Sequence, residues 1–169
     1  WLAALDVAFA NRYLDAVRAH TRGEATPEVW RILLDVPASG EILPLQLAMA
    51  GVNAHINLDL AFAVVSACRG LGRPAIDHEG QRADYDKVNT IFAEEMERLL
   101  DELAGDAPGS DLLERMASEV VALARGAAWE NAAYLWTLEP GSGPWRDHEK
   151  IMDEVAATLG RALLVDLPG

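Results

Sequence analysis

Apolar residues recur at three- and four-residue steps along most of the chain, which is the spacing of a helix with one buried face. Breaks containing glycine or proline separate these stripes, and no strand alternation persists. The predicted helices are residues 1–20, 27–34, 44–68, 85–104, 110 or 111 to 138, and 145–164. Expected helix caps are Thr26, Asp84, and Ser110 or Asp111. Val120 and Leu123 are expected to face the core.

The stretch 44–68 is apolar on nearly every side, unlike the other predicted helices. A helix without a polar face is usually surrounded by other helices, so this one is expected to be buried at the centre. The pattern therefore predicts a single-domain, all-α bundle of five substantial helices and one short helix around a central helix. Polar residues interrupt the stretch and argue against a membrane span. They are Gln46, Asn53, His55, Asn57 and Asp59.

Length, charge and cysteine content narrow the classes of function. A chain of 169 residues is expected to form one domain over residues 1–169. It begins at Trp1, already inside an apolar stripe, so residues are expected to be missing upstream. The net charge of −13 makes nucleic acid and anionic membrane poor partners. The single cysteine, Cys68, excludes an internal disulfide and fits a reducing compartment, so an acidic, soluble, cytoplasmic protein is expected.

Four polar residues of the central stretch form two pairs. At about 100° per residue, His55 and Asp59 share one helix face, whereas Asn53 and Asn57 share nearly the opposite face. An unpaired buried polar group costs on the order of 1–3 kcal/mol, so each pair needs hydrogen-bond partners. One interpretation is therefore structural, with the pairs tying the central helix to its neighbours. Candidate partners are Asn11, Arg12, Arg125 and Asn131.

The second interpretation is a functional site beside His55 and Asp59. An imidazole and a carboxylate at this spacing suit acid–base catalysis. They also suit two ligands of a single divalent metal ion, with Asp84 or His78 as a third. Segment 70–83 is long enough to be a binding loop above such a site. Ligand-binding candidates are Asn53, Asn57, Arg12, Asp84, Asn89 and Trp129.

Several common chemistries lack the residues they need. The sequence contains no Gly-x-Ser-x-Gly elbow, no P-loop and no dinucleotide fingerprint in the right context. It also lacks the Glu-x-x-His motif of di-iron carboxylate bundles. Cys68 has no neighbouring base in sequence, so a thiol nucleophile is not expected.

Four segments together resemble a bacterial family of uncharacterised helical proteins, one of the numbered domain-of-unknown-function families. They are FANRY at 9–13, AGVNAHINLDL at 50–60, DYDKVN at 84–89 and WENAAYLW at 129–136. The resemblance covers nearly the whole chain and implies a helical fold without an assigned activity. The His-x-x-x-Asp spacing is also similar to that of the helical zinc phospholipase C and P1 nuclease group, which uses more histidines than this chain has.

Two hypotheses of function remain open. In the first, the bundle binds a small molecule or a metal ion in a pocket beside the central helix, with His55 and Asp59 as catalytic residues in acid–base or hydrolytic chemistry. In the second, the protein is a non-catalytic homodimeric interaction module whose buried polar pairs only specify packing. An exposed apolar patch on one pair of helices would favour the second hypothesis.

Overall fold

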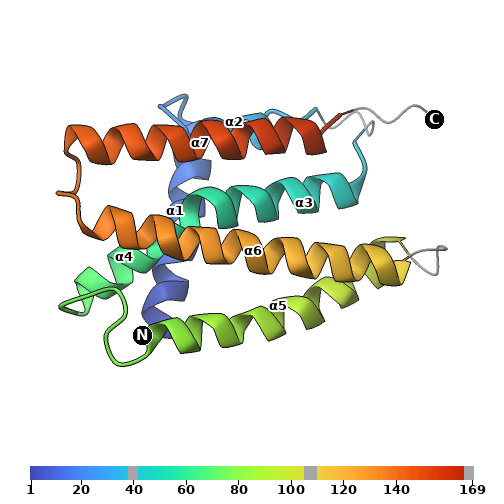
Figure 1. Ribbon diagram of the computed structural model, residues 1–169. Coiled ribbons are helices and arrows are strands. Elements are labelled where there is room, and N and C mark those ends of the chain that lie inside the picture. The colour runs from blue at the N-terminus through green and yellow to red at the C-terminus, as the bar shows by residue number, and fades with distance from the viewer. Residues whose placement is uncertain (38–41, 105–109, 166–169) are drawn as a thin grey trace.

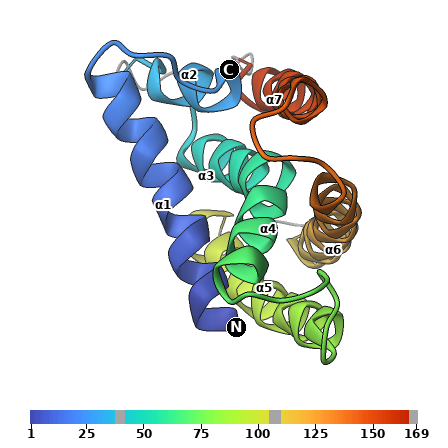
Figure 2. The same cartoon turned by 90° about the vertical axis from the view of Figure 1, so that its left-hand side faces the viewer.

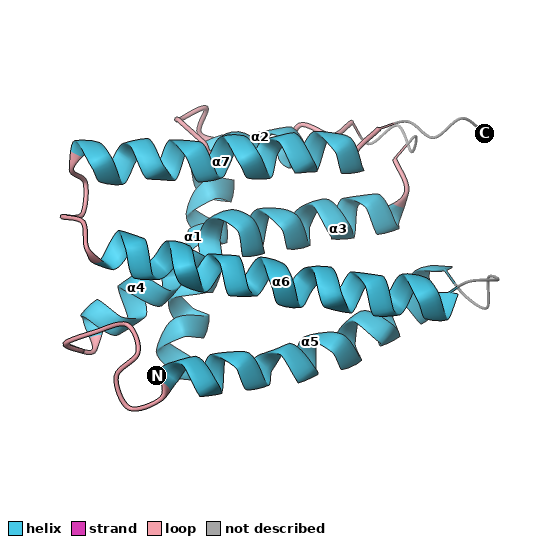
Figure 3. Ribbon diagram, viewed as in Figure 1, coloured by secondary structure: helices cyan, strands magenta, loops and turns pink. Residues whose placement is uncertain are grey.

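The computed structural model describes residues 1–37, 42–104 and 110–165, and the elements in these ranges are all helical (Figure 3). The elements are α1 (Leu2–Thr21), α2 (Glu28–Leu34), α3 (Pro44–Ala54), η1 (His55–Asp59), α4 (Leu60–Gly70), α5 (Gln81–Ala104), α6 (Ser110–Trp136) and α7 (Gly143–Leu163). Because α3, η1 and α4 are consecutive segments of one helix, the predicted five substantial helices and one short helix are confirmed. The residue before α6, which would cap it, lies outside the described ranges.

The helix Pro44–Gly70 occupies the centre of the bundle. In Figure 1 the axes of α7, α3, α6 and α5 are roughly aligned, with α6 antiparallel to α5 and α7, and α1 crosses behind them. The end-on view in Figure 2 shows α3 and α4 between α1 and the helices α6 and α7. Among the described residues this is the one helix long and apolar enough to cross a membrane, and 67% of its most apolar window is buried inside the bundle. Its burial is that of a core helix.

The central helix changes its hydrogen-bond pattern at its middle. Residues His55–Asp59 form a π-helical segment, in which the Leu60 N–H donates to the His55 carbonyl five residues earlier. The sequence predicted an uninterrupted α-helix here, because side-chain periodicity does not distinguish a single wide turn from regular turns. Single π-helical turns occur often at functional sites, so the segment marks this part of the helix for closer study.

Tertiary contacts replace the predicted cap of α2. Thr26 does not cap the helix, since its hydroxyl donates to the Glu24 carbonyl. Instead, the Asp153 carboxylate on α7 accepts hydrogen bonds from the Glu28 and Val29 N–H groups at 2.7 and 2.9 Å. A carboxylate from another helix thus satisfies these end groups and fastens α2 to α7.

Three further local predictions differ from the structure. Helix α5 begins at Gln81, so Asp84 lies within its first turn and does not cap it. Val120 and Leu123 on α6 are 58% and 74% exposed rather than buried, because the buried face of the helix passes through residues such as Val121 and Trp129. Helix α7 begins at Gly143 rather than at residue 145, because the hydroxyl of Ser142 caps it by accepting the Trp145 N–H.

Candidate functional site

His55 and Asp59 meet inside the π-helical segment. The distance from His55 Nδ1 to Asp59 Oδ2 is 3.4 Å. Nδ1 is buried and has no hydrogen-bond partner among the described residues. The contact between His55 and Asp59 is therefore electrostatic. Long contacts of this kind are common in catalytic sites without a bound substrate and do not exclude a catalytic role.

Two strong donors hold the Asp59 carboxylate. The side chain is only 1% exposed, and its Oδ1 accepts from Arg12 Nε at 3.0 Å while its Oδ2 accepts from Trp30 Nε1 at 3.0 Å. Each oxygen therefore has a directed hydrogen bond and the charge has a cationic partner, as a buried carboxylate requires. The predicted structural role of Arg12 as a partner of this pair is confirmed.

Arg12 links the buried carboxylate to the protein surface. Its Nη2 lies 3.4 Å from Glu149 Oε1 on α7, and its guanidinium carbon lies 4.4 Å from the centre of the Phe62 ring. A hollow of about 250 Å³ opens beside Arg12 and Asp59, between α1 and the Ala25–Pro27 connection. The guanidinium thus lies between a buried anion, an exposed anion and an accessible space.

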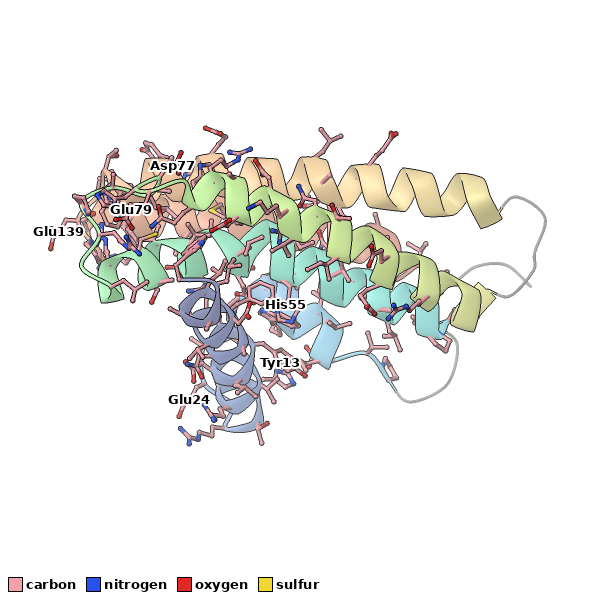
Figure 4. The ribbon with its side chains drawn as sticks, turned by 90° about the horizontal axis from the view of Figure 1, so that it is seen from below. Tyr13, Glu24, His55, Asp77, Glu79 and Glu139 are labelled. Atoms are coloured by element: carbon pink, nitrogen blue, oxygen red, sulfur yellow. The ribbon has the colours of Figure 1, made fainter. Side chains whose placement is uncertain are left out.

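Aromatic rings from two helices surround the His55 imidazole. Ring centres of Phe9, Trp30 and Tyr13 lie 4.7, 4.8 and 5.4 Å from that of His55. The His55 side chain keeps 27% exposure although its Nδ1 is buried, so the accessible edge of the ring is the one that carries Nε2. Figure 4 shows His55 and Tyr13 close together between α1 and the central helix. The histidine is held by packing yet open at one edge.

Asn53 and Asn57 point to other neighbours, as their place on the opposite face predicted. Asn53 Nδ2 donates to the Ala156 carbonyl of α7 at 2.8 Å, and Asn57 Nδ2 donates to Asn53 Oδ1 at 2.9 Å. This chain of bonds ties the central helix to α7, which agrees with the structural interpretation of the pair. Both asparagines also border a cavity between α6 and α7.

The other predicted ligand-binding residues gather in a second cluster, between α5 and α6. Asp84 pairs with Lys87 at 2.9 Å, and Asn89 accepts a hydrogen bond from the buried Arg125. Trp129 packs against Tyr85 with ring centres 5.0 Å apart. Trp129 also contacts Trp1, with ring centres 6.5 Å apart. None of the contacts described for these residues reaches His55, so the described contacts do not bring them together with it.

The loop predicted at residues 70–83 spans residues 71–80 in the structure and does not cover His55 either. It follows α4, whose eleven residues place its start roughly 16 Å along the helix axis from Asp59 at about 1.5 Å per residue. In Figure 4, Asp77 and Glu79 of this loop lie beside Glu139 at one end of the molecule, away from His55. The length of α4 carries the start of the loop away from His55. The local sequence pattern does not give this distance between the loop and the site.

The geometry gives the metal hypothesis little support. Among the described residues, no group of three His, Cys, Asp or Glu side chains is close enough to hold an ion. Both oxygens of Asp59 already accept hydrogen bonds from Arg12 and Trp30. Two of the expected ligands do meet, but the third expected ligand, Asp84 or His78, pairs with residues near its own segment.

Phe9, Tyr13 and Trp30 surround His55 but are not among the site residues predicted from the sequence. Trp30 is 2% exposed on the short helix α2 and supplies both an aromatic wall and a hydrogen bond. A signal was present, because a tryptophan buried in a short helix usually needs a partner for its N–H group. Its partner lies 29 positions away in the sequence, a relation that helical periodicity does not give.

Burial shifts the pKa of several titratable groups outside the site. Desolvation lowers the pKa of His148, whose Nε2 lies 2.9 Å from Asn131 Oδ1. Burial likewise raises the pKa of the Cys68 thiol, which is consistent with packing rather than nucleophilic chemistry. The pKa of Tyr85 rises to about 12, chiefly because the ring is desolvated. These shifts favour the neutral forms at pH 7.

The chain belongs to a family of unknown function (DUF5995), which matches residues 1–166. Membership in such a family confirms the resemblance inferred from the sequence and brings no activity with it. Searches of curated proteins and of solved structures found no match. Function must therefore be argued from the residues themselves.

Proposed function

We propose that this member of the DUF5995 family binds a small uncharged molecule at the open edge of His55 and transfers a proton to or from it. The observation that carries the proposal is the position of the imidazole. Its Nδ1 edge is buried 3.4 Å from the Asp59 carboxylate, whereas its Nε2 edge is accessible. A base in an enzyme is commonly oriented in this way by a buried carboxylate.

The carboxylate would set the tautomer of the imidazole. A negative charge beside Nδ1 favours a proton on that nitrogen and leaves the lone pair on Nε2, where a ligand or a water molecule would meet it. Asp59 can keep its charge in the interior because Arg12 and Trp30 donate to it. Asp59 and Arg12 would thus be positioning residues, and His55 the catalytic residue.

The surroundings of Nε2 favour an uncharged, partly apolar ligand. Phe9 and Tyr13 flank the imidazole, and Tyr13 is 37% exposed, so its ring is available for stacking. Stacked rings contribute about 0.5–1.5 kcal/mol beyond their buried area. The hollow described beside Arg12 and Asp59 offers a neighbouring space on the α1 side of the site.

Cleavage of p-nitrophenyl acetate, a small neutral aromatic ester, tests the proposal. We expect wild-type protein to release nitrophenol at least about tenfold faster than His55→Gln, since general-base catalysis typically contributes about 10²–10⁴-fold. Asp59→Asn should lower the rate as well, by disturbing the tautomer. His20→Gln is the matched control, because His20 also lies 3.4 Å from a carboxylate, but that carboxylate, on Asp35, is 48% exposed. Equal rates in wild type and a folded His55→Gln variant would refute the proposal.

The alternative function, a homodimeric interaction module, has one observation in its favour. Ile151, Val155 and Leu159 form an exposed apolar stripe along α7, with exposures of 57%, 55% and 47%. The net charge of −13 opposes self-association unless the contact buries enough apolar surface. Sedimentation of wild type and Val155→Glu would separate the two functions, since a dimer that the substitution dissociates would favour the module.

A further inference from the structure

The two C-terminal helices leave a cavity between them over the central helix. Contacts described between α6 and α7 lie near the turn that joins them, where His148 bonds Asn131 and packs on Tyr134. Farther from the turn, the helices border a cavity of about 250 Å³ whose floor is the central helix. Val120 and Leu159 stand at its rim and are 58% and 47% exposed. This space is independent of the His55 site, which faces α1 and α2.

Hydrogen bonds fix the orientation of the two amides at the floor of the cavity. The Ala156 carbonyl can only accept, so the Asn53 group that meets it must be the NH₂ group. Asn53 then presents its oxygen to Asn57, which must donate in turn. Asn57 therefore keeps its own carbonyl oxygen and one N–H, which are bound to no described residue. The oxygen, which has no partner among the described residues, is not fully buried.

The composition of the wall defines the chemistry that this space accepts. All the described lining residues apart from the two asparagines are aliphatic, and none is charged. An engineered cavity of about 150 Å³ holds benzene, so a cavity of about 250 Å³ has room for about ten non-hydrogen atoms. A ligand with a formal charge would lose its hydration here without gaining a counter-charge.

We infer that this cavity, the α6–α7 cavity, is a second binding site, for a neutral aliphatic molecule of about ten non-hydrogen atoms that ends in an amide. Its alkyl part would replace water against Val52, Val120 and Leu159. Its terminal amide would donate to Asn57 Oδ1 and accept from the free Asn57 N–H, which satisfies both remaining groups of that side chain. Amide-to-amide pairing of this kind needs one donor and one acceptor on each partner.

Calorimetric titration with octanamide, which has ten non-hydrogen atoms, tests the inference. We expect saturable binding with one molecule per chain. Ala162→Trp places a large ring in the mouth of the cavity and should weaken binding at least tenfold. Ala127→Trp is the matched control, since Ala127 is exposed on α6 and lines no part of the cavity. Its affinity should stay within twofold of wild type.

Two further ligands test the polar part of the inference. Octanoate carries a charge in place of the amide, and 2-nonanone offers an acceptor without a donor. Both should bind at least about threefold more weakly than octanamide, since a missing hydrogen bond leaves Asn57 unsatisfied. Equal binding of all three would refute amide recognition.

Other results would overturn the site itself. The inference fails if octanamide does not saturate the wild-type protein, or if Ala162→Trp and Ala127→Trp bind it equally. It also fails if sedimentation shows a wild-type dimer that Ala162→Trp dissociates, because a second copy of the chain would then cover this face. The esterase assay reports on His55 alone, so its failure and the failure of this site are distinguishable.

Discussion

Two histidine–carboxylate pairs in this protein have the same separation but very different surroundings. His55 and His20 each lie 3.4 Å from an aspartate oxygen, and their side chains are 27% and 30% exposed. Asp59, the partner of His55, is 1% exposed, whereas Asp35, the partner of His20, is 48% exposed. The distance between the paired groups therefore does not distinguish a surface ion pair from a candidate site.

The difference lies in what else holds the carboxylate. Asp59 receives hydrogen bonds from Arg12 and Trp30, residues far away in the sequence. Asp35 also pairs with Arg31, but that arginine is one helical turn away on the same surface and is itself half-exposed. Water competes for an exposed pair, while a buried carboxylate depends wholly on its fixed donors. A buried carboxylate held by fixed hydrogen bonds can therefore orient a histidine, whereas a surface carboxylate that exchanges its partners with water holds it less firmly.

Removing each carboxylate should give the largest contrast. Asp59→Ala leaves the Trp30 N–H group buried without an acceptor and Arg12 without its main partner, so we expect a loss of about 3 kcal/mol in the free energy of unfolding. Asp35→Ala should cost less than about 0.5 kcal/mol. Urea denaturation of both variants measures the contrast, and similar losses would show that burial of Asp59 does not matter.

Trp30→Phe isolates one donor of the buried carboxylate. The smaller phenyl ring keeps an aromatic group beside His55 but removes the 3.0 Å hydrogen bond to Asp59 Oδ2. Hydrogen bonds to charged groups contribute about 1.5–3 kcal/mol, so the variant should lose about 2 kcal/mol in urea denaturation. Trp30→Phe should destabilise the Asp59→Asn variant less than it destabilises wild type. An equal loss in both backgrounds would indicate that packing, and not this hydrogen bond, is responsible.

The pH dependence of stability should report the buried position of His148, the histidine that is paired with the Asn131 amide. Burial lowers the pKa of His148, so the folded protein favours its neutral form and the unfolded chain binds the proton more readily. This contribution is present above the ordinary pKa of 6.5 and is lost as the pH falls towards the lowered folded value. Wild type should therefore lose more stability than His148→Gln between pH 7.5 and 5.5 in urea titrations. A steeper loss in the variant would contradict this sign.

The smallest expected effect concerns the exposed pair. His20→Gln should change the free energy of unfolding by less than about 0.5 kcal/mol, because both members of the pair contact water. Thermal and urea unfolding at pH 6 check this expectation, with wild type measured in parallel. A loss above 1 kcal/mol would remove the contrast on which the comparison rests.

Local pattern predicted much of the site but not its walls. The shared face of His55 and Asp59, the separate direction of Asn53, and the role of Arg12 as a partner all agree with the structure. No local spacing relates Asp84, Asn89 and Trp129 to His55, and in the structure Asp84 pairs within α5 while Asn89 and Trp129 take part in contacts between α5 and α6. The periodicity of a segment predicts which of its faces is buried, but not which other helix packs against that face.

The sequence by itself determined which segments are helical, that the helix predicted over residues 44–68 is largely buried, and which polar residues share a face, because each depends on spacings of three or four residues. Only the tertiary structure decided that Trp30 and Arg12 converge on Asp59, that Asp153 caps α2, and that α6 and α7 leave a cavity over Asn57. The bonds to Asp59 join residues 29 and 47 positions apart. Such contacts depend on how whole helices pack, which local periodicity leaves open.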